Sequence, residues 1–473
     1  MAERSDIQKL KAYFCELTPA GRAMLETALT GAVAAELAPF RDLVLEALGQ
    51  ARDDLGEGAP PPAVAAPEAP AVERPDPWDL ILQVFDPFLI DEIPRRKTTG
   101  VIPRASRERL LIWLRTTGAP ELEAEAVEAL AQADTPEKTT KALHSLRTKL
   151  AGKLEEQLSG LDTGRGRARL AGALGGEDKL EDLRDLQVLC QRQAVFDTLA
   201  GDLVQLCALP GDEAVRAVHD RLSKIAQRTP DVLSFALVLA RRAMSGPQTF
   251  LRIGTFAADA TDGQRVADRP FGRVIDIAIS EADRAVQRAA AKQATADAAE
   301  FLAAVKTFGS TVRALCTEID FAPDGPQARR IGELRTEMGE IIRRRIQDVP
   351  ARMRSLVRPR KDEKKEPAAS EMERLEIDLK LLMTTRSFAE EIALNALAGR
   401  AHSEARDLLD TGTPILIERL RTERAESRAA LLARLEIIIR MSRVVFGHDF
   451  AATLSRSIDV ARQQAEGRKA RSA

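Results

Sequence analysis

The stretch that decides the fold is AKQATADAAEFLAAVKTFGSTVRALCTEI, residues 291–319. Small or apolar residues recur along it in alternating steps of three and four, which places them on one face of an α-helix. The heavier half of this face, here named the 301–319 seam, consists of Phe301, Val305, Phe308, Val312, Leu315 and Ile319. The pattern predicts a helix that buries the seam, either within its own bundle or in a coiled-coil-like contact with a partner.

Similar apolar stripes recur elsewhere, with leucines at helical spacing between 143 and 161 and a further stripe between 431 and 445. Hydrophobic residues make up 44% of the 473 residues and charged residues 30%, whereas aromatic residues are only 4%. Such a composition favours helices over strands. We therefore predict an all-α fold of multi-helix bundles, with no β-sheet of consequence.

Helix starts are indicated by Thr-Pro pairs, because threonine can accept a hydrogen bond from a free N–H and proline fits the first turn. Four such pairs precede periodic segments: Thr18-Pro19, Thr135-Pro136, Thr229-Pro230 and Thr413-Pro414. Their unequal spacing marks individual helices and gives no sign of a repeat.

Two segments lack the periodicity of a packed helix: residues 53–77, which contain seven prolines, and the charged residues 358–369. Both compositions are typical of linkers. The predicted order is an N-terminal helical module (1–52), a Pro/Ala-rich tether (53–77), a central helical region (78–357), a charged linker (358–369), a C-terminal helical bundle (370–465) and a tail (466–473). The Gly-rich passage 164–179 is interpreted as a flexible basic turn that divides the central region.

Charge and cysteine content exclude several classes of protein. The net charge of −2 provides no overall field that would draw the chain to nucleic acid or an anionic membrane. The four cysteines form no CxxC pair, and the longest apolar stretch, residues 232–240, is too short to span a bilayer. The charged N-terminal sequence lacks the pattern of a secretion signal. We expect a cytoplasmic protein without a transmembrane segment.

The adjacent pair His219-Asp220 is similar to the central His-Asp of helical HD-type metal phosphohydrolases. That resemblance implies a metal site formed by His144, His219, Asp220 and Asp276, in which the bound metal would activate water against a phosphate ester. The alternative is a histidine at the edge of an apolar helix face, beside an aspartate that has basic residues one turn away on both sides.

Two further histidine motifs resemble reactive sites. KALHSLRTKL, residues 141–150, resembles histidine phosphotransfer helices, with His144 as the acceptor and Arg147 three residues later; a structural helix is the alternative. His448-Asp449 forms a second His-Asp pair with His402 upstream, but Gly447 favours a helix end there, followed by the start of the next helix.

The segment 343–361 is the strongest local concentration of positive charge and predicts an amphipathic basic helix. Its candidate contacts are Arg343, Arg344, Arg345, Arg352, Arg354, Arg358, Arg360 and Lys361. Such a helix could bind nucleic-acid phosphates or an anionic surface. The alternative interpretation is that the basic residues form an ordinary solvated helix face. Arg95, Arg96 and Lys97 form a smaller basic group.

Taken together, the sequence favours a non-enzymatic scaffold, adaptor or regulatory protein that uses helix faces to bind other proteins, without a cofactor. Self-association is a further possibility through the 301–319 seam. Nucleic-acid or anionic-surface binding through residues 343–361 is the first alternative, and the metal-dependent phosphohydrolase is the second.

Overall fold

The structure is a computed structural model of residues 1–473. It describes residues 10, 11, 14, 44, 46–48, 50, 51, 75–159, 161, 164–292, 298–357, 369–422 and 425–472, with the side chains of 425–427 and 466–472 excepted. The chain forms two compact units, Met1–Pro75 and Asp76–Ala473. In the first unit, the described residues Leu10, Phe14, Val44, Ala47, Leu48 and Ala51 form an apolar cluster of their own.

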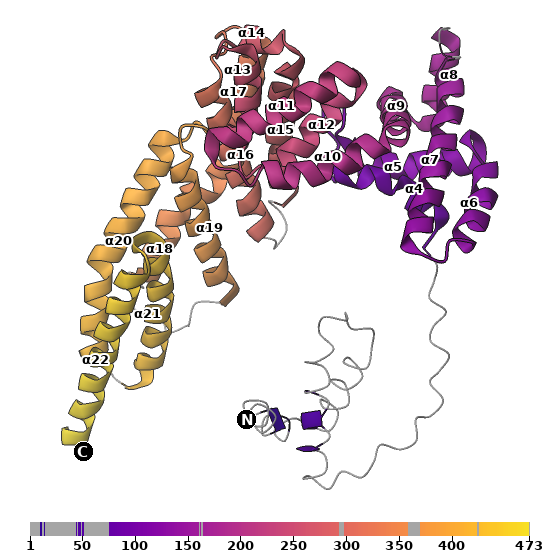
Figure 1. The fold of residues 1–473 in the computed structure, drawn as a ribbon. Helices are drawn as coiled ribbons and strands as arrows, with labels where there is room; N and C mark the ends of the chain where they lie inside the picture. The colour runs from indigo at the N-terminus through magenta and orange to yellow at the C-terminus, as the bar shows by residue number, and fades with distance from the viewer. Residues whose placement is uncertain are drawn as a thin grey trace. The chain divides into compact units, whose positions relative to one another are not determined.

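The second unit confirms the predicted all-α fold (Figure 1). In its described residues, the strands are limited to β1 (Leu89–Ile90) and β2 (Ile102–Pro103), which pair in parallel with Leu89 opposite Ile102. Their connection, residues 91–101, is here named the β1–β2 loop. The helices of the described ranges include no candidate for a membrane-spanning segment.

Among the helices before residue 192, α7 packs mainly on α9 and α6, and α5 contacts β2. Their bounds are α4 Pro77–Leu82, η2 Gln83–Phe88, α5 Arg104–Trp113, the π-helical turn η3 Leu114–Gly118, α6 Glu121–Ala131, α7 Pro136–Ser159, α8 Gly164–Leu174 and α9 Glu177–Gln191.

The middle helices include the most extensive contact between any two elements, that of α15 with α16. Their bounds are α10 Gln193–Leu206, α11 Gly211–Arg228, η5 Pro230–Val232, α12 Leu233–Ala243, α13 Pro247–Ala258, α14 Gly263–Ala267, η6 Pro270–Gly272, α15 Arg273–Lys292 and α16 Ala298–Glu318.

The last helices pack around α20, which contacts each of its neighbours from α17 to α22. Their bounds are α17 Pro326–Gln347, α18 Val349–Val357, α19 Ala369–Ser387, α20 Asn395–Thr422, α21 Ala425–Phe446 and α22 His448–Ser472.

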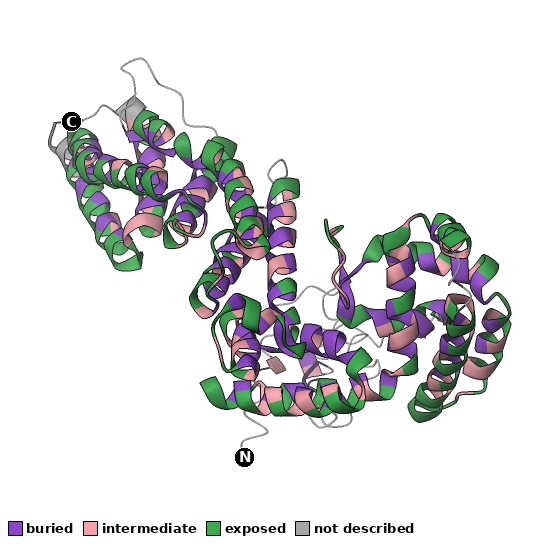
Figure 2. Cartoon of the chain, turned by 90° about the horizontal axis from the view of Figure 1, so that it is seen from above, coloured by how far each residue is buried: buried purple, intermediate pink, exposed green. Residues whose placement is uncertain are grey.

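The 301–319 seam is a core face of the chain itself. All six of its residues are 2% exposed or less, and α16 packs on α15, α13 and α19. Figure 2 shows the same pattern along the helices, with buried residues on inner faces and exposed residues outside. The interpretation of the seam as a partner surface is therefore corrected, because neighbouring helices already cover it. Residues 293–297 of the quoted stretch lie outside the described residues.

The Thr-Pro pairs predict two helix starts correctly. α7 begins at Pro136, where Thr135 Oγ1 accepts from the N–H of Lys138 at 3.3 Å, and η5 begins at Pro230 before running into α12. The third prediction is wrong, because Pro414 lies inside α20. Thr18-Pro19 lies outside the described residues.

The Gly-rich passage 164–179 is mostly helical, which corrects its interpretation as a flexible turn. Residues 164–174 form α8, and the chain turns at Gly175 and Gly176, whose φ angles are +90° and +144°. α8 packs on α9 and α5 through buried Ala171 and Leu174. The arginines, alanines and leucines between the glycines are good helix formers, and this buried face adds a tertiary contact.

The central and C-terminal regions share one apolar core. A single cluster of buried side chains extends from Trp78 to Ala461. α19 and α20 pack against α16, α17 and α18, across the predicted linker at 358–369. Residues 358–368 of that linker, like residues 53–74 of the predicted tether, lie outside the described residues.

Candidate functional site

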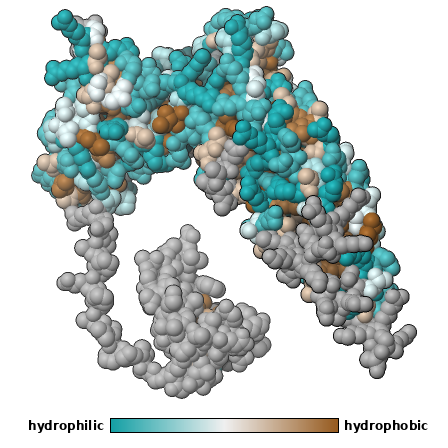
Figure 3. Space-filling view, turned by 180° about the vertical axis from the view of Figure 1, so that it is seen from behind, coloured by the Kyte–Doolittle hydropathy of each residue, from teal (hydrophilic) through white to brown (hydrophobic). Residues whose placement is uncertain are grey.

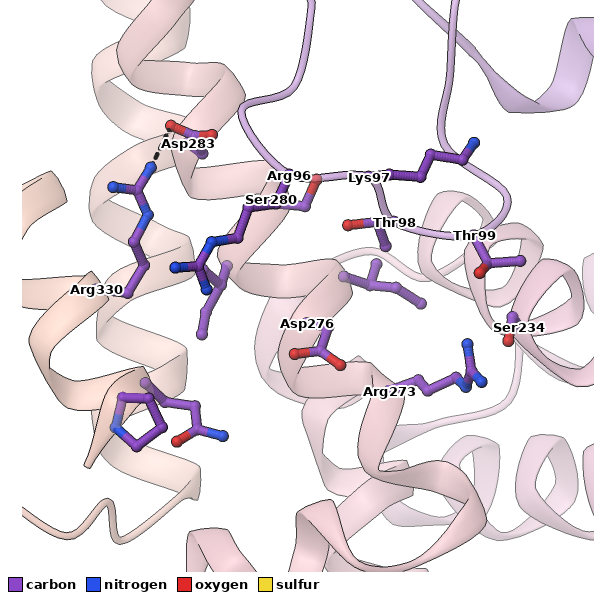
Figure 4. A pocket seen from close by; sticks show the side chains of 14 residues that line it. Arg96, Lys97, Thr98, Thr99, Ser234, Arg273, Asp276, Ser280, Asp283 and Arg330 are labelled. Carbon is purple, nitrogen blue, oxygen red and sulfur yellow. Dashed lines mark hydrogen bonds and ion pairs between the residues drawn. The ribbon is translucent and has the colours of Figure 1, made fainter. Parts of the chain in front are cut away.

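A cavity of about 420 Å³ lies where the β1–β2 loop meets α12, α15 and α17 (Figure 4). The loop contributes residues 96–99, α12 contributes Ser234, and α15 contributes residues of its first three turns. Pro326 and Gln327, at the start of α17, close another side. Because the first turns of α15 and α17 both line the space, the partial positive charge of two helix beginnings adds to that of the side chains.

The β1–β2 loop is fixed over α15 and α17 by ion pairs. Arg95 makes two hydrogen bonds to the carboxylate of Glu337 in α17, at 2.8 and 2.6 Å. Glu92 accepts from Arg288 of α15 at 2.8 Å. The pKa of Arg95 is raised and that of Glu337 is lowered, in each case mainly by their mutual hydrogen bonds. This bidentate geometry holds the loop in one register over the cavity.

A buried cluster fixes the other side of the loop to α9. Lys97 Nζ donates to Asp185 Oδ2 at 2.6 Å and to Asp182, and it also donates to the carbonyl of Val101 at 3.2 Å. The N–H of Gly100 reaches Asp185 at 3.3 Å. Burial alone would lower the pKa of Lys97, but the two carboxylates hold it above its usual value. Burial raises the pKa of Asp185, and Lys97 offsets part of that increase.

The lining therefore contains cations that already have carboxylate partners. Lys97 is bonded to the aspartates of α9, and Arg330 Nη2 donates to Asp283 Oδ1 at 3.0 Å. Asp283 is buried and lies 3.5 Å from Arg95 Nη1 as well. These pairs are structural, and their charge is neutralised within the protein.

Arg96 and Arg273 differ from these paired cations. Both line the cavity, and Figure 4 shows Arg96 entering from the loop and Arg273 from the start of α15. Within the described part of the chain, Arg96 has no hydrogen-bond or ion-pair partner, and Arg273 interacts only through its field with Asp276. Burial raises the pKa of Asp276, while Arg273 lowers it in part.

The neutral part of the lining is also mostly polar. It contains the hydroxyl groups of Thr98, Thr99, Ser234 and Ser280 and the amide of Gln327. Ser280 is only 8% exposed, and its buried hydroxyl has no hydrogen-bond partner among the described residues. Two uncompensated guanidinium groups beside several hydroxyl groups suit an anion that also forms neutral hydrogen bonds.

The four residues of the predicted metal site do not converge, which corrects that hypothesis. His144 lies on α7, which packs on α6 and α9, whereas His219 and Asp220 lie on α11, which packs on α12 and α13. Asp276 lines the cavity. In the described ranges, no group of three or more histidine, cysteine, aspartate or glutamate residues is arranged to hold a metal ion.

His219 is held by aromatic packing. Its ring centroid lies 5.0 Å from that of Phe256 and 5.1 Å from that of Phe271. Its Nε2 and Nδ1 atoms lie 3.3 Å from Ser223 Oγ and Asp220 Oδ1, respectively. Both ring nitrogens therefore have local partners, as expected for a histidine at the edge of an apolar face.

The resemblance of residues 141–150 to histidine phosphotransfer helices does not hold at Arg147, the basic residue of the motif. Arg147 is half-buried and donates to the carbonyls of Leu80 and Ile81 at 2.7 and 3.0 Å. Burial lowers the pKa of Arg147. It thus satisfies the last carbonyls of α4 rather than standing beside His144, which is half-buried on α7.

His402, His448 and Cys190 show no arrangement for chemistry in the described structure. His402 is buried and accepts from Arg386 Nη1 at 2.9 Å. His448 begins α22 directly after Gly447, whose φ of +95° ends α21, so the predicted helix boundary is confirmed. Burial raises the pKa of the Cys190 thiol to about 12, which keeps it protonated.

The predicted basic segment is partly used within the fold. Arg345 and Arg352 bind the buried carboxylate of Asp378, and Arg345 also lies 4.7 Å from the ring centre of Phe301. Arg343 pairs with Glu340 at 3.2 Å, and Arg354 lies 3.9 Å from Glu404. Arg344 is exposed, whereas Arg358, Arg360 and Lys361 lie outside the described residues. The described arginines do not form one free basic face.

Comparison of the chain with known protein families, curated proteins and solved structures gives no match. The cavity therefore has to be interpreted from its own residues. The sequence shows the basic group at 95–97, but it does not show that Arg96 alone of the three lacks a bonded partner among the described residues. A signal was available, since three successive cations followed by Thr98-Thr99-Gly100 join two short apolar segments.

Proposed function

We propose that the protein is a helical regulatory protein that binds a small anionic ligand in the cavity beneath the β1–β2 loop. One observation carries the proposal: Arg96 and Arg273 share this cavity without bonded carboxylates, whereas Lys97 and Arg330 in the same lining are paired. A guanidinium group gains most from a planar or tetrahedral oxyanion that accepts two hydrogen bonds. An anion bound at either arginine would neutralise charge that has no bonded carboxylate among the described residues.

The rigid position of Arg96 supports this proposal. Its two neighbours, Arg95 and Lys97, are both fixed by ion pairs, to α17 and α9 respectively. The backbone that presents Arg96 is therefore held in place before any ligand arrives. Preorganisation of this kind lowers the entropy cost of binding.

Titration calorimetry with inorganic phosphate and with sulfate tests anion binding directly. We expect saturable binding that weakens as salt is added, because the interaction is electrostatic. Arg96→Gln and Arg273→Gln should each weaken binding by about tenfold or more, in line with the loss of a charged hydrogen bond.

Arg400→Gln provides the matched control, since Arg400 is exposed on α20, away from the cavity lining. It should bind both anions like the wild-type protein. Absence of saturable binding to either anion, or equal weakening by all three substitutions, would contradict an anion site in this cavity.

As a second candidate, we propose a scaffold or adaptor role through exposed helix faces. Ile415 of α20 is 56% exposed, and Phe450 and Val460 of α22 are 44% and 49% exposed, on two helices that pack together. On the face shown in Figure 3, apolar residues lie in separate small groups among hydrophilic ones. Scattered exposed side chains are ordinary, so the support comes from three of them on one pair of helices.

The adaptor role predicts that Ile415→Glu combined with Phe450→Glu abolishes association with a second copy or with a stoichiometric partner. Light scattering of the purified protein and affinity capture would measure the two kinds of association. Arg96→Gln should leave both unchanged. If the double substitution also leaves both unchanged, this pair of helices is not the contact surface.

A further inference from the structure

We infer that Asp185 of α9 is a positioning residue of the anion site, because it holds the backbone that presents Arg96 to the cavity. The inference rests on the proposed anion binding and adds a residue that controls it. Asp185 is not among the residues that line the cavity. Its effect on an anion therefore has to pass through the β1–β2 loop.

One carboxylate oxygen of Asp185 binds the loop at two points. Its Oδ2 atom accepts from Lys97 Nζ at 2.6 Å and from the N–H of Gly100 at 3.3 Å. The two donors flank Thr98 and Thr99, which both line the cavity. Asp185 therefore fixes both ends of this part of the loop to α9.

Burial makes these two bonds hard to replace. The side chains of Lys97 and Asp185 are 11% and 8% exposed, and Gly100 is buried. In Figure 4 the Lys97 side chain points away from Asp276 and Arg273. A buried N–H that loses its acceptor costs the free energy of its desolvation, because water cannot take the acceptor's place. Without the Asp185 carboxylate, the backbone at Gly100 is expected to rearrange.

The turn at Gly100 passes such a change back along the loop. The N–H of Val101 donates to the carbonyl of Thr98 at 3.0 Å, which closes the turn. The φ angle of Gly100 is +77°, a left-handed conformation that suits glycine. Because one hydrogen bond and one glycine conformation define this turn, a rearrangement at Gly100 also moves Thr98 and the residues before it.

Arg96 depends on an attachment at each side. Arg95 is bound to Glu337 of α17, and this contact does not involve α9. Lys97 is the attachment to α9. Removal of Asp185 would loosen only the second attachment. The Arg96 side chain would then sample more positions, and ordering it on an anion would cost more entropy.

Asp182 offers a matched comparison on the same helix. It also accepts from Lys97 Nζ and is 1% exposed, but within the described structure it makes no hydrogen bond to the loop backbone. Asp182→Ala and Asp185→Ala each remove one buried negative charge and one partner of Lys97. Only Asp185→Ala also removes the acceptor of the Gly100 N–H. The pair of variants thus separates the backbone contact from the charge.

Titration calorimetry of the full chain with inorganic phosphate and with sulfate measures the effect. Asp185→Ala should weaken binding by about three- to tenfold, the range expected for ordering one long side chain. Asp182→Ala should weaken it by no more than about twofold, since the loss of a nearby negative charge favours an anion. Asp185→Asn keeps an oxygen that can accept from Gly100, so it should retain most of the wild-type affinity.

A double-substitution cycle shows whether Asp185 acts through Arg96. Asp185→Ala should have no further effect on binding when Arg96→Gln is already present, and it should keep its effect in the presence of Arg273→Gln. General destabilisation of the fold would weaken binding in both cases. Circular dichroism would verify that each variant folds.

Hydrogen exchange of the Gly100 amide gives a measurement that needs no anion. The amide should exchange faster in Asp185→Ala than in Asp182→Ala, because only the first variant removes its acceptor. An unchanged exchange rate in Asp185→Ala would overturn the inference whether or not an anion binds.

The remaining outcomes distinguish this inference from the proposed function. If the wild-type protein binds neither anion, the proposed function is overturned, and Asp185 has no site to position. If the wild-type protein binds an anion and Asp182→Ala weakens binding as much as Asp185→Ala, the contact with the loop backbone is not the cause. That result would overturn the role of Asp185 while anion binding stands.

Discussion

Asp378 is a buried carboxylate of α19 that is 1% exposed and joins three helices. It accepts from Arg345 Nε of α17 at 2.7 Å and from Arg352 of α18. Asp378→Ala would leave two partly buried guanidinium groups without their shared partner. We expect the free energy of unfolding to fall by about 3 kcal/mol, at the lower end for a broken buried pair because both arginines keep some contact with water.

Denaturant unfolding of Asp378→Ala measures this loss. Asp410→Ala is the matched control, because Asp410 lies on the surface of α20 and is 3.7 Å from Arg406. An exposed pair of this kind contributes at most about 1 kcal/mol. Equal destabilisation by the two substitutions would contradict the structural role assigned to Asp378.

His402 should make the fold sensitive to mild acid. Burial and the positive charges of Arg386 and Arg406 lower the pKa of His402 from its usual 6.5. Below that pH, the unfolded chain binds a proton that the folded chain rejects, so the free energy of unfolding decreases as the pH falls from 6.5 towards the folded pKa. Above pH 6.5 the two states bind the same number of protons at this site, and the effect vanishes.

His402→Gln removes this titration while keeping a side chain that can accept from Arg386. The difference in unfolding free energy between wild type and variant at pH 8 measures the packing change alone. As the pH is lowered below 6.5, the wild-type protein should lose stability relative to the variant. Parallel curves at all pH values would show that His402 contributes nothing to the pH dependence.

At the residue scale, the sequence identified reactive side chains but not their surroundings. His219 and Asp220 suit metal chemistry, yet Phe256 and Phe271 reach His219 from α13 and η6, which periodicity cannot foresee. The same limit applied to the cavity. The sequence shows that Arg96 is basic, but only the fold shows that Arg95 and Lys97 are paired whereas Arg96 has no bonded partner in the described part of the chain.

Individual helices were more predictable than their packing. The stripe of the 301–319 seam is buried, and α7 begins at Pro136 as expected. The helix start predicted at Pro414 is wrong. A single proline removes only one hydrogen bond, and the buried face of α20 continues past it through Leu408, Leu416 and Leu420. Tertiary burial on both sides of the proline therefore outweighs its local preference for a helix start.

Close packing of α18 on α20 depends on Gly412. A Cβ atom at this position would overlap Cγ1 of Val357. Gly412→Ala should therefore lower the free energy of unfolding by about 1–3 kcal/mol, the usual cost of overpacking. The helix propensity of alanine offsets only part of this cost.

Gly399 offers the control within the same helix, since no atom of the described ranges lies within 4 Å of a Cβ added there. Gly399→Ala should raise the free energy of unfolding by about 0.5–1 kcal/mol, because alanine is the better helix former. Denaturant unfolding compares the two variants. A change of the same sign at both positions would contradict the close approach at Gly412.

At the scale of the whole molecule, the boundary predicted at 358–369 reflects the composition of that segment, whereas the helices on its two sides pack together. α17 contacts α15 on one side and α19 and α20 on the other, so the helices before and after the boundary are neighbours in one core. The charge and proline content of a segment indicate that it is a solvated linker, but they do not indicate which helices on its two sides pack together. Which helices pack together depends on how their apolar faces pair. Because several helices have similar apolar faces, the sequence does not predict this pairing.

This shared core predicts coupled unfolding of the second unit. The chain has two tryptophans, Trp78 in α4 and Trp113 in α5, so fluorescence reports the region before the boundary, whereas far-UV circular dichroism reports all helices. Because α17 packs on both regions, we expect the two signals to change at the same denaturant concentration. A chain without residues 1–75 controls for the first unit, which has a separate cluster.

Asp378→Ala makes this test stringent, because Asp378 lies in α19, far along the chain from both tryptophans. If the regions unfold together, removing its ion pairs should move the fluorescence midpoint as far as the circular dichroism midpoint, since one equilibrium governs both. If the C-terminal helices instead form a separate bundle, the substitution should shift only part of the circular dichroism change and leave the fluorescence midpoint in place. That result would restore the boundary at 358–369 as a true domain border, despite the contacts of α17 with both sides.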